Sequence, residues 1–484
     1  MGDFELLLVM PVVCLSGYGL LVLLLVPWQR GHSRYLGLAS LIGLGMTAFF
    51  LLRLWSAWQL VGPMETAHGM VRIDGFGLFF SFILLLAGAL SVLYSMNFLE
   101  REEADQGEFY ALVLFCLAGM LLMLHTTHLM MVLIGLEIFS LALYVLTGLT
   151  RMRVRSVEAS LKYFLLGAFS SGFLAYGLAL LYGATRSLDL EVIGDHATQA
   201  PSRMLWIGLG LLLIGLAFKI AIVPFHQWVP DVYQGAPTNV TGFMAAATKT
   251  AAFAVLLRIL VGAFGNHSEI WVPLLTWLAI VTMTVANLIA LTQRNLKRLL
   301  AFSSIAHAGY LLIAMVCRPE QGIRAILFYL TAYTLMTVGA FATLAAGGRG
   351  DAEGERGYSL SAWAGLGWRR PLLGLALSFF LFSLAGLPPT GGFFGKYVIF
   401  MAALDAKRYF LAVAGALNAA VAVYYYLRVV VTLYMHEPES DDLPLPLSPA
   451  TATVLVLAAM GVLYLGLAPG RLLDLIHSLG ATLL

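Results

Sequence analysis

The stretch Leu216–Thr238, LAFKIAIVPFHQWVPDVYQGAPT, decides how the rest of this sequence is interpreted. It continues an apolar run that opens near Met204, yet it carries Lys219 inside the run and interrupts it at Pro224. A lysine at bilayer depth costs roughly 2.5–3.5 kcal/mol, and a broken membrane helix leaves backbone groups that need buried partners. The stretch therefore predicts a broken transmembrane helix whose buried charge has a function.

The composition of the 484-residue chain indicates a polytopic membrane protein. Of its residues, 60% are hydrophobic and 11% are charged, and the mean hydropathy is +0.88, outside the range of soluble globular domains. A net charge of +2 without a basic patch excludes nucleic acid as a partner. The three cysteines lie far apart and lack metal-ligand or cluster spacing, so we predict no metal and no cofactor in this chain.

The apolar runs predict an all-α fold with about 14 transmembrane helices, at about 20 residues per span. An even number of spans places both ends of the chain on one side of the membrane. More lysine and arginine residues follow the odd-numbered spans, Lys297 and Arg298 among them, which predicts that both termini lie outside the cytoplasm. The predicted spans are 4–27, 35–58, 75–98, 109–124, 128–149, 158–183, 204–233 (broken), 237–262, 270–291, 299–316, 322–346, 371–404 (broken), 408–434 and 450–468.

A second proline break points to internal symmetry. Pro388 and Pro389 interrupt the later apolar run SLAGLPPTGGFFGKYVIF, much as Pro224 interrupts the first. Paired interruptions in two halves are typical of transporters built from repeats, with the site near the bilayer midplane. Lys219 lies before its break and Lys396 after, which indicates inverted or diverged halves and not an exact duplicate. We predict two inverted, pseudo-symmetric repeats. The predicted units are a single transmembrane domain over 1–484 and, within it, five-helix repeats over 109–262 and 270–434.

The ionisable residues inside the predicted spans indicate the cargo. Glu137, in LIGLEIFSLALYVL, is the one acid in mid-span, whereas four of the six lysines lie within apolar runs. Hard metal cations bind carboxylate and carbonyl oxygens, and lysines repel them. Buried lysines release protons more readily than exposed ones, and a neighbouring carboxylate reverses that change. The pattern thus predicts proton transport, and the four lysines are Lys162, Lys219, Lys249 and Lys396.

We predict a relay among these groups. Glu137 and Lys219 form a pair that holds the lysine charged while it is closed, and opening the pair lets the proton pass to Lys249 and then to Lys396. The alternative interpretation is that individual lysines extend toward the membrane surface or neutralise helix ends.

Four further residues are predicted to support the relay. His226 follows the Pro224 break, and His307 and Tyr310 share the motif LKRLLAFSSIAHAGY. Imidazole both gives and takes a proton near neutral pH, although packing is the alternative for each histidine. Lys162 is the fourth. The alternative interpretation of Lys162 is an ordinary ion pair with Glu158, four residues earlier on the same helix face.

Together these motifs resemble the proton-conducting antiporter-like membrane subunits of respiratory complex I, over essentially the whole chain. Within that family, PDVYQGAPT is similar to the subunit N branch of NADH-quinone oxidoreductase. Subunit L is disfavoured because the sequence shows no long lateral helix, and subunit M because it usually carries Glu at the position of Lys396. The motifs that carry the resemblance are Glu137, Phe218-Lys219, VPFHQWVPDVYQGAPT, Thr248-Lys249, LKRLLAFSSIAHAGY and GLPPTGGFFGK.

The resemblance implies a translocase subunit in a bacterial inner (plasma) membrane, with both termini on the periplasmic side. It implies that Glu137 and Lys219 belong to an input half-channel in the first repeat, that Lys249 is the central relay, and that Lys396 ends the output half in the second repeat. The redox groups, FMN, iron–sulfur clusters and quinone, are expected in partner subunits, and the partners implied are subunits M, K and J and the lipid bilayer. Two alternatives stay open: a subunit of an Mrp-type Na⁺/H⁺ antiporter, and one of a ferredoxin-dependent complex.

Overall fold

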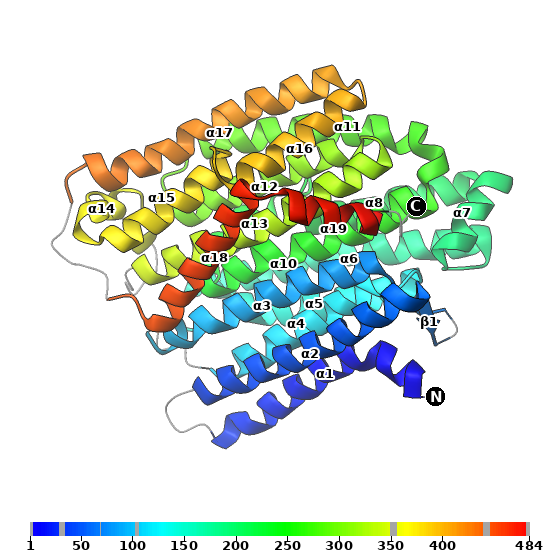
Figure 1. The fold of residues 1–484 in the computed structure, drawn as a ribbon, viewed down its shortest axis with the longest axis horizontal. Coiled ribbons are helices and arrows are strands. Elements are labelled where there is room, and N and C mark those ends of the chain that lie inside the picture. Colours follow the sequence, from blue (N-terminus) through cyan, green and yellow to red (C-terminus); the bar gives the residue numbers. More distant parts are fainter. Residues whose placement is uncertain are drawn as a thin grey trace.

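The computed structural model describes residues 3–28, 34–67, 69–101, 106–348, 356–438 and 446–480. Long helices lie side by side in a slab, with α1 and α2 along one edge and α17 along the opposite edge (Figure 1). The helices of the first half are α1 (Asp3–Leu25), α2 (Arg34–Val61), α3 (Gly75–Arg101), α4 (Glu108–Leu124), α5 (Leu129–Thr147), α6 (Val154–Thr185), α7 (Leu190–Gln199), α8 (Arg203–Ile220), α9 (Trp228–Gly235) and α10 (Thr238–Leu257). Those of the second half are α11 (Ser268–Ala290), α12 (Leu296–Met315), α13 (Pro319–Gly347), α14 (Leu366–Arg369), α15 (Pro371–Ala385), α16 (Gly391–Asp405), α17 (Tyr409–Met435), α18 (Pro449–Leu467) and α19 (Gly470–Gly480).

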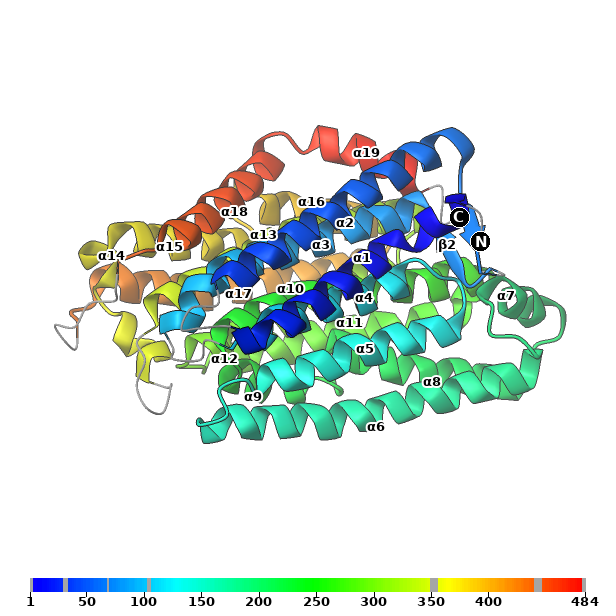
Figure 2. The same ribbon diagram turned by 90° about the horizontal axis from the view of Figure 1, so that it is seen from below.

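The helices confirm the prediction of an all-α polytopic membrane protein. Twelve described helices are long and apolar enough to cross a membrane, and α4 and α15 are shorter apolar helices. Together they match the predicted spans, with α9 and α16 as the second halves of the two broken ones. The start of α1 and the end of α19 lie at the same end of the slab (Figure 2), as an even number of spans requires.

Short elements fill the ends of the bundle. Strands β1 (Met64–Thr66) and β2 (Val71–Ile73) form an antiparallel hairpin near α7, at the end opposite α14 (Figures 1 and 2). The remaining short helices are η1 (Val26–Trp28), η2 (Arg258–Ala263), η3 (Gly265–His267), η4 (Arg356–Tyr358) and η5 (Ser361–Trp363).

The core of the slab is formed by α10, α12 and α13. All residues of α10 are buried, and α10 is rich in alanine and threonine. Small residues let membrane helices approach closely, because association in lipid depends on van der Waals packing and not on the hydrophobic effect. By contrast, the peripheral helices expose large apolar side chains, such as Leu24, Phe169 and Leu417. Charged groups carried by the central helices are therefore shielded from lipid.

The two breaks share one backbone geometry. Ala221 and Gly386 have positive φ, +63° and +88°, at the ends of α8 and α15. At each end the next residue donates its N–H to a carbonyl five residues earlier: Ile222 to Ala217 at 3.1 Å, and Leu387 to Phe382 at 3.0 Å. This Schellman arrangement satisfies the carbonyls that a helix end leaves open. The prolines then prevent the helix from continuing, since proline has no N–H.

A buried ion pair fixes the end of α10 near the hairpin. Arg258 donates two hydrogen bonds to the Asp74 carboxylate, at 2.7 and 2.8 Å, and one to the Leu124 carbonyl at 2.8 Å. Burial alone would raise the pKa of Asp74, but the Arg258 charge, its hydrogen bonds and the Gly77 N–H outweigh burial and hold that pKa below its usual value. Removing one partner of such a pair typically costs about 3–5 kcal/mol.

One prediction about the loops is wrong. Lys297 and Arg298 were expected outside the helices, but both lie in the first turn of α12. Asn295 caps this helix by accepting the Arg298 N–H at 3.2 Å, so the helix begins three residues before the predicted span. The Lys297 side chain is buried, with 3% of its surface exposed.

Candidate functional site: a series of buried lysines

Lys219 lies in the last turn of α8, directly before the first break, and is 2% exposed. Its Nζ donates to Ser140 Oγ of α5 at 2.8 Å. The ammonium also lies over the rings of Phe139 and Tyr144, at 5.5 and 5.7 Å from the ring centroids. A buried cation needs such partners, because burying a charge without compensation is far costlier than burying a neutral group.

Glu137 lies on the same face of α5, one turn from Ser140, and interacts electrostatically with Lys219. The two do not form a direct ion pair among the described residues: Lys219 is bonded to Ser140, and Glu137 Oε1 is buried without a hydrogen-bond partner in the described part of the chain. The predicted pair is therefore separated here, with Ser140 holding the lysine.

Lys249 lies in the middle of α10 and is 2% exposed. Its Nζ donates to the backbone carbonyl of Ser304 on α12, and it lies 5.7 Å from the centroid of the Tyr333 ring. The Tyr333 hydroxyl in turn donates to Ser304 Oγ at 2.8 Å. No hydrogen bond or ring contact joins Lys219 to Lys249 within the described ranges, so any transfer between them needs an intermediate carrier or a rearrangement.

His307 is one turn further along α12 and is also buried. Its Nδ1 is hydrogen-bonded to the Tyr329 hydroxyl, and its Nε2 lies 3.2 Å from the Tyr426 hydroxyl. Tyr426 is itself hydrogen-bonded to Ser303 Oγ. Both ring nitrogens thus have hydroxyl partners that can either donate or accept, an arrangement that lets an imidazole exchange protons on two sides.

Lys396, on α16 after the second break, is 5% exposed. Its Nζ donates to the last carbonyls of α15, Leu384 O at 3.0 Å and Ala385 O at 2.8 Å. It also lies 5.0 Å from the centroid of the Tyr310 ring, and that ring is 5.8 Å from the ring of His307. The structure therefore gathers four predicted residues at one helix: His307 and Tyr310 belong to α12, and Lys249 and Lys396 contact it.

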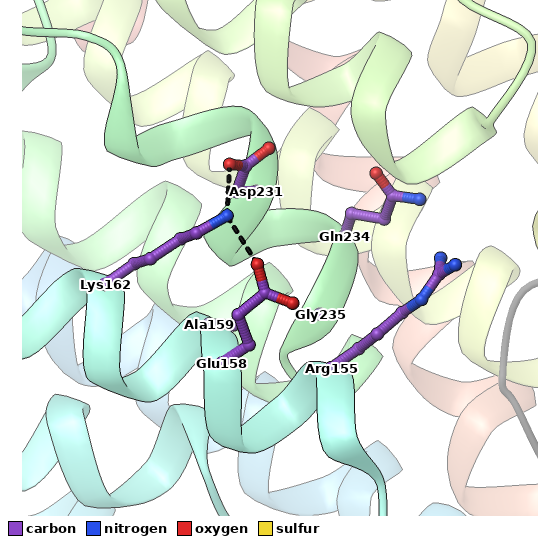
Figure 3. Close-up of a pocket in the computed structure, with 7 residues that line it drawn as sticks. All are labelled: Arg155, Glu158, Ala159, Lys162, Asp231, Gln234 and Gly235. Carbon is purple, nitrogen blue, oxygen red and sulfur yellow. Dashed lines mark hydrogen bonds and ion pairs between the residues drawn. The ribbon is translucent and has the colours of Figure 1, made fainter.

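Lys162 differs from the other three lysines because its side chain is 43% exposed. Its Nζ pairs with Glu158 at 2.6 Å, the ordinary i,i+4 pair given as its alternative. It also donates to Asp231 of α9 at 2.9 Å, and the three side chains line an open cavity of about 220 Å³ (Figure 3). Arg298 occupies the other oxygen of Asp231 at 2.7 Å.

His226 lies in the segment between α8 and α9, half-buried, and its Nδ1 has no hydrogen-bond partner among the described residues. Within the described ranges, no hydrogen bond joins its side chain to the network of Lys249, His307 and Tyr426 around α12. In the described part of the chain, no group of three or more His, Cys, Asp or Glu side chains could hold a metal ion.

Several residues around the site were missed from the sequence. Tyr329 and Tyr426 are buried and hydrogen-bonded to His307, and Tyr333 is buried and bonded to Ser304. Tyrosines in apolar helices give no signal that distinguishes them from packing residues. Asp231 gave a signal that was not used: an acid inside the key motif, three residues after Trp228, is a candidate partner for a lysine. Lys297 was misplaced because its basic neighbour made it look like a loop residue.

Comparison with known proteins decides the family. The family model described as "NADH:quinone oxidoreductase/Mrp antiporter, TM" matches residues 126–422. NADH-quinone oxidoreductase subunit N of Trichlorobacter lovleyi is 45% identical over 470 residues, covering 96% of this chain and 95% of that protein. The chain belongs to the subunit N family of NADH-quinone oxidoreductase. The expected resemblance is thereby confirmed.

Solved structures agree with this family membership. A chain of respiratory complex I from Thermus thermophilus is 38% identical, with a TM-score of 0.80, and the match covers 96% of this chain and 99% of that one. A chain of the Mrp complex from Dietzia sp. DQ12-45-1b shares the fold at 22% identity and a TM-score of 0.85. The family model's range includes Glu137, Lys219, Lys249 and Lys396, so every predicted relay residue lies within the part of the chain that the model matches.

Proposed function

We propose that this chain is a proton-translocating membrane subunit of an NADH:quinone oxidoreductase, a translocase whose redox chemistry takes place in other subunits. The observation that carries the proposal is the series of lysines, Lys219, Lys249 and Lys396, all buried within the bundle of apolar helices. Intramembrane ionisable residues are rare and mark ion pathways. Their partners are neutral hydroxyls, carbonyls and rings, which suit a group that must lose its charge during a cycle.

The two repeats divide the pathway in this proposal. The segment 109–262 forms an input half with Glu137 and Lys219, and 270–434 forms an output half that ends at Lys396. Lys249 receives the proton between them, and His307 hands it along α12. Each transfer moves a charge, and carrying one charge across 100 mV needs about 2.3 kcal/mol, so electron transfer in partner subunits supplies the drive.

The proposed partners are other membrane subunits of complex I, with subunit M beside this chain and the small subunits K and J, in a bacterial inner membrane. FMN, iron–sulfur clusters and quinone belong to those partner subunits and to the peripheral arm. Both termini are proposed to face the periplasm, in line with the excess of basic residues after the odd-numbered spans.

Reconstitution tests this function. The chain is tagged, the assembly that copurifies with it is placed in liposomes, and proton movement is recorded on addition of NADH and a quinone. We expect flavin and iron–sulfur subunits to copurify and proton transport to depend on NADH and to be independent of Na⁺. Na⁺/H⁺ exchange by the purified chain alone would instead support the Mrp-type alternative, and dependence on ferredoxin would support the third possibility.

A further inference from the structure

The helix α9 is held by a basic pair on α12. Arg298 Nη1 donates to Asp231 Oδ1 at 2.7 Å and to Gln234 Oε1 at 3.1 Å. The adjacent Lys297 Nζ donates to the carbonyl of Ala236, the residue directly after α9. Three polar groups in and directly after one eight-residue helix therefore bind two consecutive side chains of another helix, and that other helix belongs to the second predicted repeat.

The two halves of this contact differ in burial: the Arg298–Asp231 ion pair is partly exposed, with 33% and 37% of the two side chains accessible, whereas Lys297 is buried. Lys297 is 3% exposed and lies 5.1 Å from the centroid of the Tyr358 ring. The Tyr358 hydroxyl accepts a hydrogen bond from Thr238, the first residue of α10, at 2.7 Å. The turn between α9 and α10 is thus enclosed by the basic pair and Tyr358. Exposed ion pairs contribute little, whereas a buried cation leaves a large penalty when its partner is lost.

The other end of α9 contacts the neighbour of Lys219. Trp228 stacks between Tyr163 of α6 and Phe218 of α8, at centroid distances of 4.6 and 5.3 Å. Its Nε1 also donates to the Phe218 carbonyl at 3.0 Å. A shift of α9 would therefore move Phe218, and the Lys219 Nζ lies 5.8 Å from the centroid of that ring.

The helix α12 also links the basic pair to Lys249, the central lysine. Ser304, whose carbonyl accepts the hydrogen bond from Lys249, follows Lys297 by seven residues on α12. Residues seven apart lie on the same helix face, about 10 Å apart at 1.5 Å per residue. A continuous series of contacts thus runs from Lys219 through Phe218 and Trp228 to the basic pair, and along α12 to Lys249.

We propose that Lys297 and Arg298 are positioning residues that clasp α9 to α12, so that the surroundings of Lys219 and Lys249 change together. The clasp connects the two lysines that no direct contact joins, because Trp228 of α9 contacts Phe218, the neighbour of Lys219, and the Ser304 carbonyl of α12 accepts the hydrogen bond from Lys249. This inference rests on the proposed proton-translocating function and adds to it the means by which the first break is tied to the centre of the pathway.

The test uses the whole assembled complex carrying Arg298→Ala, Lys297→Met or Asp231→Asn. We expect NADH:quinone electron transfer to persist while the ratio of protons moved to electrons transferred falls by about 2-fold or more. Arg298→Lys should restore most of the ratio. The double variant Asp231→Asn/Arg298→Ala should be no worse than either single one, since residues in one network are not additive.

Matched controls separate positioning from general destabilisation. Arg294→Ala removes an exposed arginine just before the same helix and should leave the ratio unchanged. Hydrogen–deuterium exchange in the Arg298→Ala complex should speed up at the backbone amides of α9 but not at those of α16. If exchange at α9 and the proton-to-electron ratio both match the unmodified complex, the clasp is refuted.

The same preparations distinguish this failure from failure of the proposed function. Lys219→Ala should abolish proton transport in either case. A Lys219→Ala complex that pumps normally would overturn the function, whereas inactive Lys219→Ala beside fully coupled Arg298→Ala and Lys297→Met would overturn only the clasp.

Discussion

The two broken helices have the same backbone but hold their lysines in different ways. In each, a Schellman cap ends the first half three residues before a proline, Pro224 after Ala221 and Pro389 after Gly386. At the first break, Lys219 precedes the cap and reaches across to another helix, where it binds Ser140. At the second, Lys396 follows the cap and reaches back to the open carbonyls of its own first half.

This difference shows that one backbone geometry, a capped helix break, can stabilise a buried lysine in two different ways. Lys396 binds the C-terminal end of α15, where the helix dipole and unpaired carbonyls favour a cation. Its hydrogen bonds are built into the break, and the Tyr310 ring of α12, with its centroid 5.0 Å away, adds a contact with the ammonium. Lys219 instead depends on α5, which supplies both the Ser140 hydroxyl and the nearby Glu137 charge. Movement of α5 would therefore change both the hydroxyl partner of Lys219 and its distance from the Glu137 charge.

The largest expected effect comes from removing Lys219. Lys219→Ala should abolish proton pumping in an assembled complex, because the relay loses its first carrier. Lys162→Ala should reduce pumping much less, since that side chain is 43% exposed and already paired with Glu158. Proton uptake per electron in reconstituted vesicles measures both. Pumping close to the unmodified level in an assembled Lys219→Ala complex would contradict the relay.

The second expected effect tests whether the break itself holds Lys396. Gly386→Ala places a methyl group 2.8 Å from Lys396 Cδ and 3.3 Å from its Nζ, and a side chain at positive φ adds about 1–2 kcal/mol. We expect impaired pumping and a lower melting temperature of the complex. Gly17→Ala, whose added methyl meets nothing within 4 Å, is the control and should leave both unchanged. Normal pumping by Gly386→Ala would mean that the position of Lys396 matters little.

A smaller effect is expected from changing Ser140, whose hydroxyl accepts the hydrogen bond from Lys219. Ser140→Ala removes the group that holds Lys219 away from a direct pair with Glu137, and a hydrogen bond to a charged group is worth about 1.5–3 kcal/mol. We expect proton transport to slow by on the order of 10-fold, measured as the initial rate in vesicles. Ser170→Ala, which loses only a bond to the Gly215 carbonyl, should have no such effect. Equal rates in the two variants would show that Ser140 is a packing residue.

The smallest effect is expected from making the first break resemble the second. Ala221→Gly relieves the cost of an alanine at φ +63°, and the gain is limited to about 1 kcal/mol because glycine also adds freedom to the unfolded chain. We expect a slightly higher melting temperature and unchanged pumping. A clear loss of pumping would show that Ala221 does more than end a helix.

Much of the fold could be predicted from the sequence because a membrane imposes strong constraints on it. Apolar runs of about 20 residues predict spans directly, and the two proline interruptions predicted both broken helices. The short elements could not be predicted this way: α7 and α19 are too short or too polar to span. Lys297 was misassigned for a related reason, since charge density alone does not separate a loop from the capped first turn of a helix.

The site was predicted in its members but not in its geometry. An isolated lysine in an apolar run stands out by composition, so Lys219, Lys249 and Lys396 could be named. Their partners could not, because the backbone carbonyls of Ser304 and Leu384 carry no sequence signal, and the hydroxyls of Ser140 and Tyr426 resemble many others. The prediction of a closed Glu137–Lys219 pair stays a prediction, since the structure has Ser140 as the direct partner of Lys219.

The sequence by itself determined which segments cross the membrane, where two of them break, and which charges lie inside, because each follows from the cost of burying polar groups in lipid. Tertiary structure alone decided which group holds each lysine. It also placed α12 beside Lys249, through the Ser304 carbonyl, and beside Lys396, through the Tyr310 ring. Those contacts join residues far apart in the chain, such as Lys249 with Ser304 and Arg298 with Asp231. Such pairings depend on helix packing, which local sequence patterns do not encode.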